Sequence, residues 1–113
     1  MICVALSTGK NGALIQCKAN GHAGFSKKGS DIVCSAVTIL LRTAMQLLSQ
    51  NENVALKADT LLRGNLAFRV EVKKECPETE LLLKCTADFI RCGIGSLTEE
   101  YPENVQLRED KQR

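Results

Sequence analysis

Hydrophobic and polar residues alternate with two different periods along the chain, and this separates strands from helices. Ile2–Ser7 is apolar and favours a β-strand, and Ala13–Ala19 alternates apolar with polar residues, as a half-buried strand does. Between them, Thr8–Gly12 contains an Asn-Gly pair, which is typical of a tight turn. The first twenty residues therefore predict a β-hairpin.

A long buried helix is expected next, because apolar residues recur at helical spacing from Ile32 to Leu48. Ser30 is a good N-cap and Asp31 follows it in the first turn, so the helix should run from there to about Gln50. The preceding segment Gly24–Gly29 is rich in glycine and polar residues. That composition favours a mobile loop that could cover a site.

A second β unit is predicted at Val54–Leu62 and Leu66–Lys73, which flank a reversal at Arg63–Asn65. Pro77 then opens a second helix, which should end near Gly93–Ser96 or one turn beyond. The apolar positions of this second helix include Leu81, Leu82, Cys85, Phe89 and Cys92.

A last short strand is expected around Val105 and Leu107, before the charged tail Arg108–Arg113. The resulting order β-β-α-β-β-α-β predicts an α/β (α+β) fold, a small mixed sheet with two helices on one or both faces. A length of 113 residues leaves room for a single domain, residues 1–113.

Composition and charge limit the function. The net charge of +2 and the few aromatic residues, Phe25, Phe68, Phe89 and Tyr101, predict no direct binding of nucleic acid. The amino terminus lacks the pattern of a secretory signal, so the six cysteines should be reduced and the protein cytoplasmic. We expect no membrane span, since uninterrupted apolar stretches are only a few residues long.

The only histidine, His22, lies twelve positions before Cys34. A thiol in the first turn of a helix has its anion stabilised by the helix dipole, and an imidazole nearby can take its proton. This spacing therefore predicts a cysteine nucleophile used for hydrolysis. Asp31 either interacts favourably with the helix dipole or orients the imidazole of His22. The Thr38 hydroxyl, one turn after Cys34, bonds a backbone carbonyl or reaches the sulfur, and we favour the carbonyl.

The segments Gly21-His22-Ala23-Gly24 and Gly29-Ser30-Asp31-Ile32-Val33-Cys34-Ser35-Ala36-Val37-Thr38 closely resemble the signature of the bacterial ribosomal-processing cysteine proteases. The resemblance implies a small α/β homodimer that removes an amino-terminal extension from ribosomal large-subunit protein twenty-seven, cutting after an aromatic residue. It implies His22 as general base, Cys34 as nucleophile and Asp31 as a matching acidic position. Ser35 and Thr38 depart from the family's alanine and serine.

Other residues are candidates for binding the substrate. The lid and substrate contacts are expected at Gly21, Ala23, Gly24, Phe25 and Gly29. The strand that ends in Ala19-Asn20-Gly21 is the candidate sheet edge against which a peptide would align. Cys85 and Cys92, seven apart on one helix face, suit burial in the core or in a dimer seam.

Three alternatives accompany the protease interpretation. One is a noncatalytic ribosome-assembly protein, another is an RNA-binding module, and the third is a thiol redox sensor that uses Cys34. No Cys-x-x-Cys pair occurs and one histidine cannot complete the common zinc patterns. The sequence therefore predicts no metal site and no cofactor.

Overall fold

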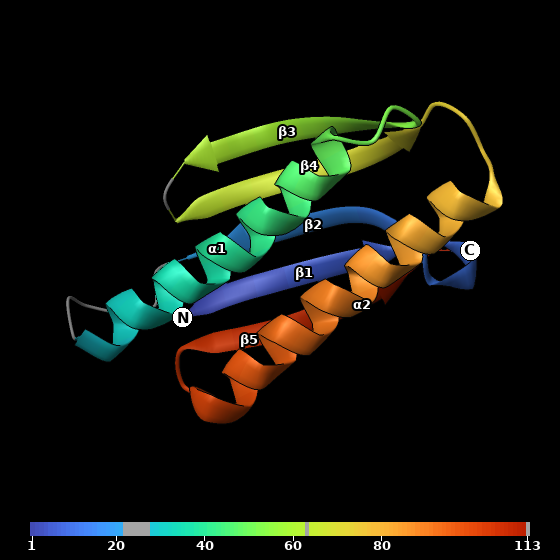
Figure 1. Cartoon of the computed structure of the whole chain (residues 1–113). Helices are drawn as coiled ribbons and strands as arrows, with labels where there is room; N and C mark the ends of the chain where they lie inside the picture. The colour runs from blue at the N-terminus through green and yellow to red at the C-terminus, as the bar shows by residue number, and fades with distance from the viewer. Residues whose placement is uncertain (22–27, 63, 113) are drawn as a thin grey trace.

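The computed structural model describes residues 1–21, 28–62 and 64–112. The elements follow one another as β1 (Ile2–Thr8), β2 (Leu14–Asn20), α1 (Lys28–Ser49), β3 (Val54–Leu62), β4 (Asn65–Val72), α2 (Pro77–Glu100) and β5 (Val105–Lys111) (Figure 1). This is the order that the hydrophobic pattern predicts. Between β1 and β2 the chain makes a short 3-10 turn in which Asn11 and Gly12 have positive φ angles of 65° and 79°.

The five strands form one mixed sheet in the order β3-β4-β2-β1-β5. Only β1 and β5 run parallel, and the other neighbours are antiparallel. β2 lies inside the sheet, because Ala19 pairs with Val4 of β1 on one side and with Leu66 of β4 on the other. The prediction that the strand ending in Ala19-Asn20-Gly21 is a sheet edge is therefore wrong.

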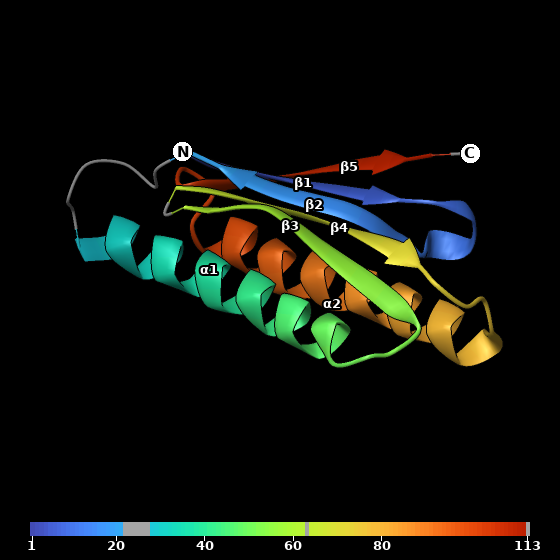
Figure 2. The same cartoon turned by 90° about the horizontal axis from the view of Figure 1, so that it is seen from above.

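Both helices pack on the same face of the sheet, with α1 and α2 side by side (Figure 2). Phe68 has the largest side chain among the fully buried residues. The rest of the core cluster comes from all five strands and both helices, and includes Val4, Leu6, Cys17, Val33, Leu41, Ile90, Ile94 and Val105. The polar side chains of the inner strands point to the opposite face, as at Lys18 and Arg69. The sheet is thus two-sided, with an apolar face under the helices.

Helix α1 begins at Lys28, two residues before the predicted N-cap Ser30. Of the expected loop Gly24–Gly29, residues 28 and 29 are therefore helical, and residues 24–27 lie outside the described residues. Glycine lowers helix stability by only about 1 kcal/mol, which the long apolar side of α1 outweighs. That side buries Val33, Leu41 and Leu48 against the sheet.

The same helix contains an 18-residue stretch, Ile32–Ser49, which is long and apolar enough to cross a membrane by length and composition, with a mean hydropathy of 1.6. The sequence analysis did not anticipate this stretch. Its composition follows from the packing of α1, because a helix that covers a sheet must supply one side of the core. Val37 and Ala44 of α1 show this directly, since both are buried in the core.

Helix α2 buries a different face from the predicted one. Leu81, Cys85, Phe89 and Cys92 are exposed, so of the two predicted places for the cysteines, the core and a dimer seam, the core is wrong. The buried positions are Thr79, Leu83, Thr86, Ala87, Ile90 and Ile94. Two of these residues are threonines, which the hydrophobic pattern of the sequence counts as polar. The Thr86 hydroxyl donates to the Leu82 carbonyl at 2.7 Å, and a satisfied hydroxyl can be buried at little cost.

Strand β5 continues to Lys111 and so includes most of the residues expected to form a charged tail. Its backbone pairs with β1 from Ile2 to Thr8. On the helix side, Glu109 accepts a hydrogen bond from Arg91 of α2 at 2.7 Å. The parallel ladder and this ion pair explain why a polar segment is held as a strand.

Candidate active site

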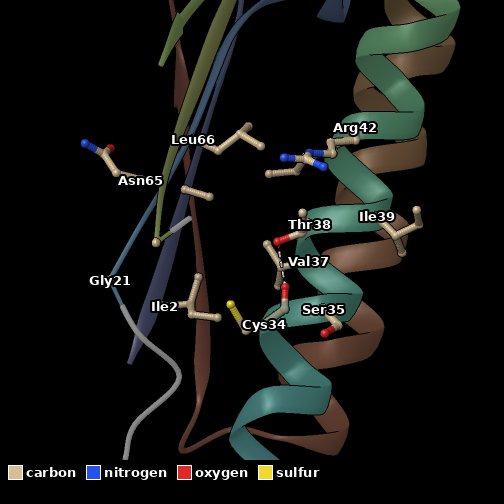
Figure 3. A pocket seen from close by; sticks show the side chains of 13 residues that line it. Ile2, Gly21, Cys34, Ser35, Val37, Thr38, Ile39, Arg42, Asn65 and Leu66 are labelled. Carbon is tan, nitrogen blue, oxygen red and sulfur yellow. Dashed lines mark hydrogen bonds between the residues drawn. The ribbon is translucent and has the colours of Figure 1, made fainter. Parts of the chain in front are cut away.

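A pocket of about 390 Å³ lies between the first half of α1 and the ends of β1, β2 and β4 (Figure 3). Its apolar wall joins segments that are far apart in the sequence, because Ile2, Ala19 and Leu66 come from three different strands. The helix side contributes Cys34, Ser35, Val37, Thr38, Ile39, Leu41 and Arg42. The remaining lining residues are Gly21, Gly64 and Asn65. The volume suits one side chain and the adjoining backbone of a bound peptide.

Cys34 presents its thiol to this pocket, with the sulfur directed toward Ile2 (Figure 3). The residue is half-buried and its sulfur is free. Because α1 begins at Lys28, Cys34 is the seventh helical residue and not a first-turn residue as predicted. The unpaired N–H groups of a helix belong to its first four residues, here 28–31. They lie roughly 4.5–9 Å along the axis from Cys34, beyond the first turn in which the dipole acts strongly.

The Thr38 hydroxyl donates to the Cys34 backbone carbonyl at 2.8 Å (Figure 3). This confirms the preferred one of the two predicted roles, a hydrogen bond to the carbonyl one turn back. The hydroxyl therefore stabilises the backbone of the turn that contains Cys34 and is not directed at the sulfur. Thr38 also lines the pocket, so its methyl group can contribute apolar surface there.

Gly21 turns the chain out of β2 at the rim of the pocket. Its φ angle is +103°, and a Cβ atom at this position would overlap the Met1 carbonyl oxygen. Its N–H donates to the Gly64 carbonyl at 2.9 Å. Glycine is therefore required both by the backbone conformation and by the close approach of another chain segment.

The remaining predicted site residues are only partly within the structure. His22, Ala23, Gly24 and Phe25 lie outside the described residues. Gly29 and Asp31 belong to the first turn of α1, and only their helical backbone is described. The pairing of His22 with Cys34, the role of Asp31 and the lid thus stay predictions.

Four of the other five cysteines lack the environment of Cys34. Cys17 is fully buried in the core, and burial raises its pKa from 9.0 to about 12, so that it stays protonated at neutral pH. Cys3, Cys85 and Cys92 are exposed outside this pocket. Within residues 1–21, 28–62 and 64–112, no three histidine, cysteine or acidic side chains come together as a metal-binding group.

The sequence analysis missed the opposite wall of the pocket. Ile2 and Leu66 are separated from Cys34 by long stretches of sequence, and only the sheet order brings them to it. Arg42 was overlooked although a signal existed, since it follows Thr38 by four residues, one helical turn. The helical face that carries Cys34 and Thr38 thus continues to Arg42.

Comparison with known proteins assigns the family. The chain is similar to the solved structure of an essential ribosomal processing protease Prp from S. aureus in complex with a covalently linked product peptide, with 22% identity, a TM-score of 0.74, and coverage of 97% of this chain and 100% of that one. It is also similar to SMU.848 from Streptococcus mutans, with 27% identity, a TM-score of 0.71, and coverage of 99% and 96%. No curated protein matches it in sequence. The family model described as cysteine protease Prp matches residues 1–106, and the chain therefore belongs to the Prp family of cysteine proteases.

Proposed function

We propose that this protein is the endopeptidase that removes the amino-terminal extension of ribosomal large-subunit protein twenty-seven, with Cys34 as nucleophile and His22 as general base. One observation carries this assignment: the half-buried thiol of Cys34 opens into a pocket that Gly21 also lines. His22 is the next residue in the chain, and consecutive Cα atoms are about 3.8 Å apart. This sequence adjacency of the only histidine to a residue of the pocket supports its pairing with the thiol.

In the proposed reaction, the imidazole of His22 takes the proton of the Cys34 thiol, and the thiolate attacks the scissile carbonyl carbon. The tetrahedral intermediate collapses to a thioester as the imidazolium donates its proton to the leaving amine. A water molecule, deprotonated by the same imidazole, then hydrolyses the thioester and frees Cys34. Because Cys34 lies in the second turn of α1, proton transfer to the imidazole is the main source of the nucleophile.

The pocket also supports recognition of an aromatic side chain before the cut. Ile2, Ala19 and Leu66 supply an apolar wall opposite Cys34, which a phenylalanine ring would fill better than a charged or small side chain. Since β2 is an interior strand, the peptide cannot align by adding to its edge. We infer that the substrate instead crosses the groove between α1 and the ends of the inner strands.

Incubation of the purified protein with the ribosomal precursor, followed by mass determination of the products, tests the assignment. We expect one cut after an aromatic residue, no turnover by Cys34→Ala, and a loss of about a thousandfold or more in His22→Ala. The matched control is Cys92→Ala, which removes an exposed thiol from the outer side of α2 and should retain full activity. Turnover by Cys34→Ala, or equal cleavage after phenylalanine, alanine and aspartate, would contradict the proposal.

We further propose that the protein is a homodimer. Large apolar side chains are exposed on both helices, with Ile39 at 62% and Leu81 at 61% of their full exposure. Ile32, Leu47 and Phe89 belong to the same outer layer of helices. Cys85 and Cys92 lie on the same exposed stripe of α2 as Leu81 and Phe89, which fits their predicted alternative place in a dimer seam. Apolar patches of this kind mark association surfaces.

Light scattering at micromolar concentration tests the dimer. We expect twice the mass of one chain for the native protein and for the control Val72→Glu, which places a charge at an exposed apolar residue of β4. Phe89→Glu should be a folded monomer. A native protein that is monomeric at this concentration would reject the proposal.

We also propose that the protein works in the cytoplasm. All six of its cysteines are free, as expected in a reducing compartment. Alkylation after acid quenching of intact cells should find every thiol reduced, and a substantial disulfide-bonded fraction would contradict this location.

A further inference from the structure

The pocket that holds Cys34 carries one charged group on its described lining, Arg42. Its side chain extends from α1 across the pocket in the direction of Leu66 (Figure 3). The rest of the lining is apolar or uncharged, including Ile2, Ala19 and Val37. Arg42 itself is exposed, so an anionic ligand that enters the pocket can reach its guanidinium group.

Arg42 has no ion pair or hydrogen-bond partner among the described residues. The ion pairs found there involve Arg69 with Asp59 and Glu71, and Arg91 with Asp88 and Glu109. A guanidinium group offers five N–H donors in a planar fork that matches a carboxylate. Arg42 is therefore available to a ligand that enters the pocket.

The position of Arg42 relative to Cys34 sets where it would meet a bound peptide. The two residues are eight positions apart on one helix, which is about 12 Å along its axis. An extended peptide advances about 3.3 Å per residue, so this distance spans roughly three to four residues. Helical side chains lean toward the helix amino terminus, so the long side chain of Arg42 brings its guanidinium group nearer to Cys34. The separation is then closer to three peptide residues than to four.

We propose that Arg42 forms an acidic-residue subsite, which binds the carboxylate of an aspartate or glutamate about three residues from the scissile bond. The proposal rests on the proposed peptidase function and makes it more specific. One isolated guanidinium favours a single carboxylate over the many phosphates of an RNA chain, which would require several cations. The subsite acts on substrate choice, because Arg42 is too far from Cys34 to touch the reacting atoms.

Paired peptides test the subsite. In a cleavable precursor peptide, glutamate or glutamine is placed singly at each position from two to five residues on either side of the cut. At one position of this scan we expect the native enzyme to cleave the glutamate peptide with a kcat/KM about tenfold higher than its glutamine partner, mainly through a lower KM. In Arg42→Gln the ratio of kcat/KM on the glutamate peptide to that on the glutamine peptide should fall to about one, and Arg42→Lys should keep part of the preference.

The matched control is Arg108→Gln, which makes the same charge change at an exposed residue of β5 that does not line the pocket and should keep the preference. Equal rates on glutamate and glutamine peptides at every scanned position, or an unchanged preference in Arg42→Gln, would overturn the proposal. If the native enzyme cleaves no peptide, the proposed function fails. The subsite is then decided by peptide affinity on a Cys34→Ala background, where the glutamate peptide must bind about tenfold tighter, and only with Arg42 present.

Discussion

Replacement of Gly21 by alanine probes the junction between the sheet and the pocket. Gly21 has a φ angle of +103°, and an added Cβ would overlap the carbonyl oxygen of Met1. Gly12 provides a matched control at the opposite end of the hairpin. Its φ angle is also positive, +79°, but the nearest atom that its Cβ would meet is a side-chain carbon of Lys84 at 3.8 Å, an ordinary contact. The two substitutions share the conformational strain and differ in the overlap.

The structure gives a magnitude for each change. A non-glycine residue held at positive φ costs about 1–2 kcal/mol, so Gly12→Ala should lower the free energy of unfolding by roughly that amount. The overlap at Gly21 requires the first strand to shift, which adds about 1–3 kcal/mol. We therefore expect Gly21→Ala to lose about 3 kcal/mol, and each kcal/mol corresponds to roughly 4 °C in Tm for a domain of this size.

Chemical denaturation gives the two free energies, and cleavage of the precursor is measured at a temperature where both variants stay folded. Gly12→Ala should keep its activity within about twofold. Gly21→Ala should lose at least tenfold, because a displacement of about 1 Å in a catalytic group can cost about a hundredfold in rate. If Gly21→Ala is as stable and as active as Gly12→Ala, then the close approach to Met1 is not a constraint and the reasoning is wrong.

Three further changes follow from the same structure. The Cys17 thiol has a pKa raised from 9.0 to about 12, so the unfolded chain loses this proton first as pH rises. The contribution of Cys17 to the free energy of unfolding should therefore fall by about 1.4 kcal/mol per pH unit between those values. Denaturant titration should show that, from neutral pH to pH ~10.5, the native protein loses about 2 kcal/mol more than Cys17→Ala does. An equal fall in both would refute this. Phe68→Ala should cost about 3–5 kcal/mol in the same assay, since Phe68 is fully buried, and a loss below about 1 kcal/mol would contradict its place in the core. Thr38→Val should change cleavage by less than about threefold, because its hydroxyl bonds a backbone carbonyl, and a hundredfold loss would instead place the hydroxyl on the reacting atoms.

The sequence predicted the elements well because their signals are local. Val54–Leu62 is a strand with the predicted bounds, and the chain reverses at the predicted Asn11-Gly12 pair, where both residues have positive φ angles. The position of β4 beside β2 depends instead on pairing between distant segments, and the alternation of residues within a strand does not encode which neighbour it takes. This is why β2 was expected at an edge.

The candidate site shows the same division between local and distant signals. The single histidine and Cys34 were identified from spacing and resemblance, and the structure confirms that Cys34 faces a pocket. The wall formed by Ile2 and Leu66 required the sheet order. Helix α2 shows a different failure, since Thr79 and Thr86 are buried with hydrogen-bonded hydroxyls. Because the hydrophobic pattern counts both threonines as polar, it assigns the wrong face of α2 to the core.

The start of α1 at Lys28, three residues before the expected first helical residue Asp31, bears on the proposed role of Cys34. A thiol at the helix terminus would gain much of its reactivity from the dipole and the free N–H groups. At the seventh helical position, Cys34 gains little from either, and the Thr38 hydroxyl bonds the carbonyl of Cys34 and not its sulfur. In the proposed reaction the acceptor for the thiol proton comes from another segment, and Gly21, which precedes the proposed base in the sequence, lines the same pocket. Under the proposed function, the strict need for glycine at position 21 bears on activity as well as on stability, because His22 is the next residue in the sequence.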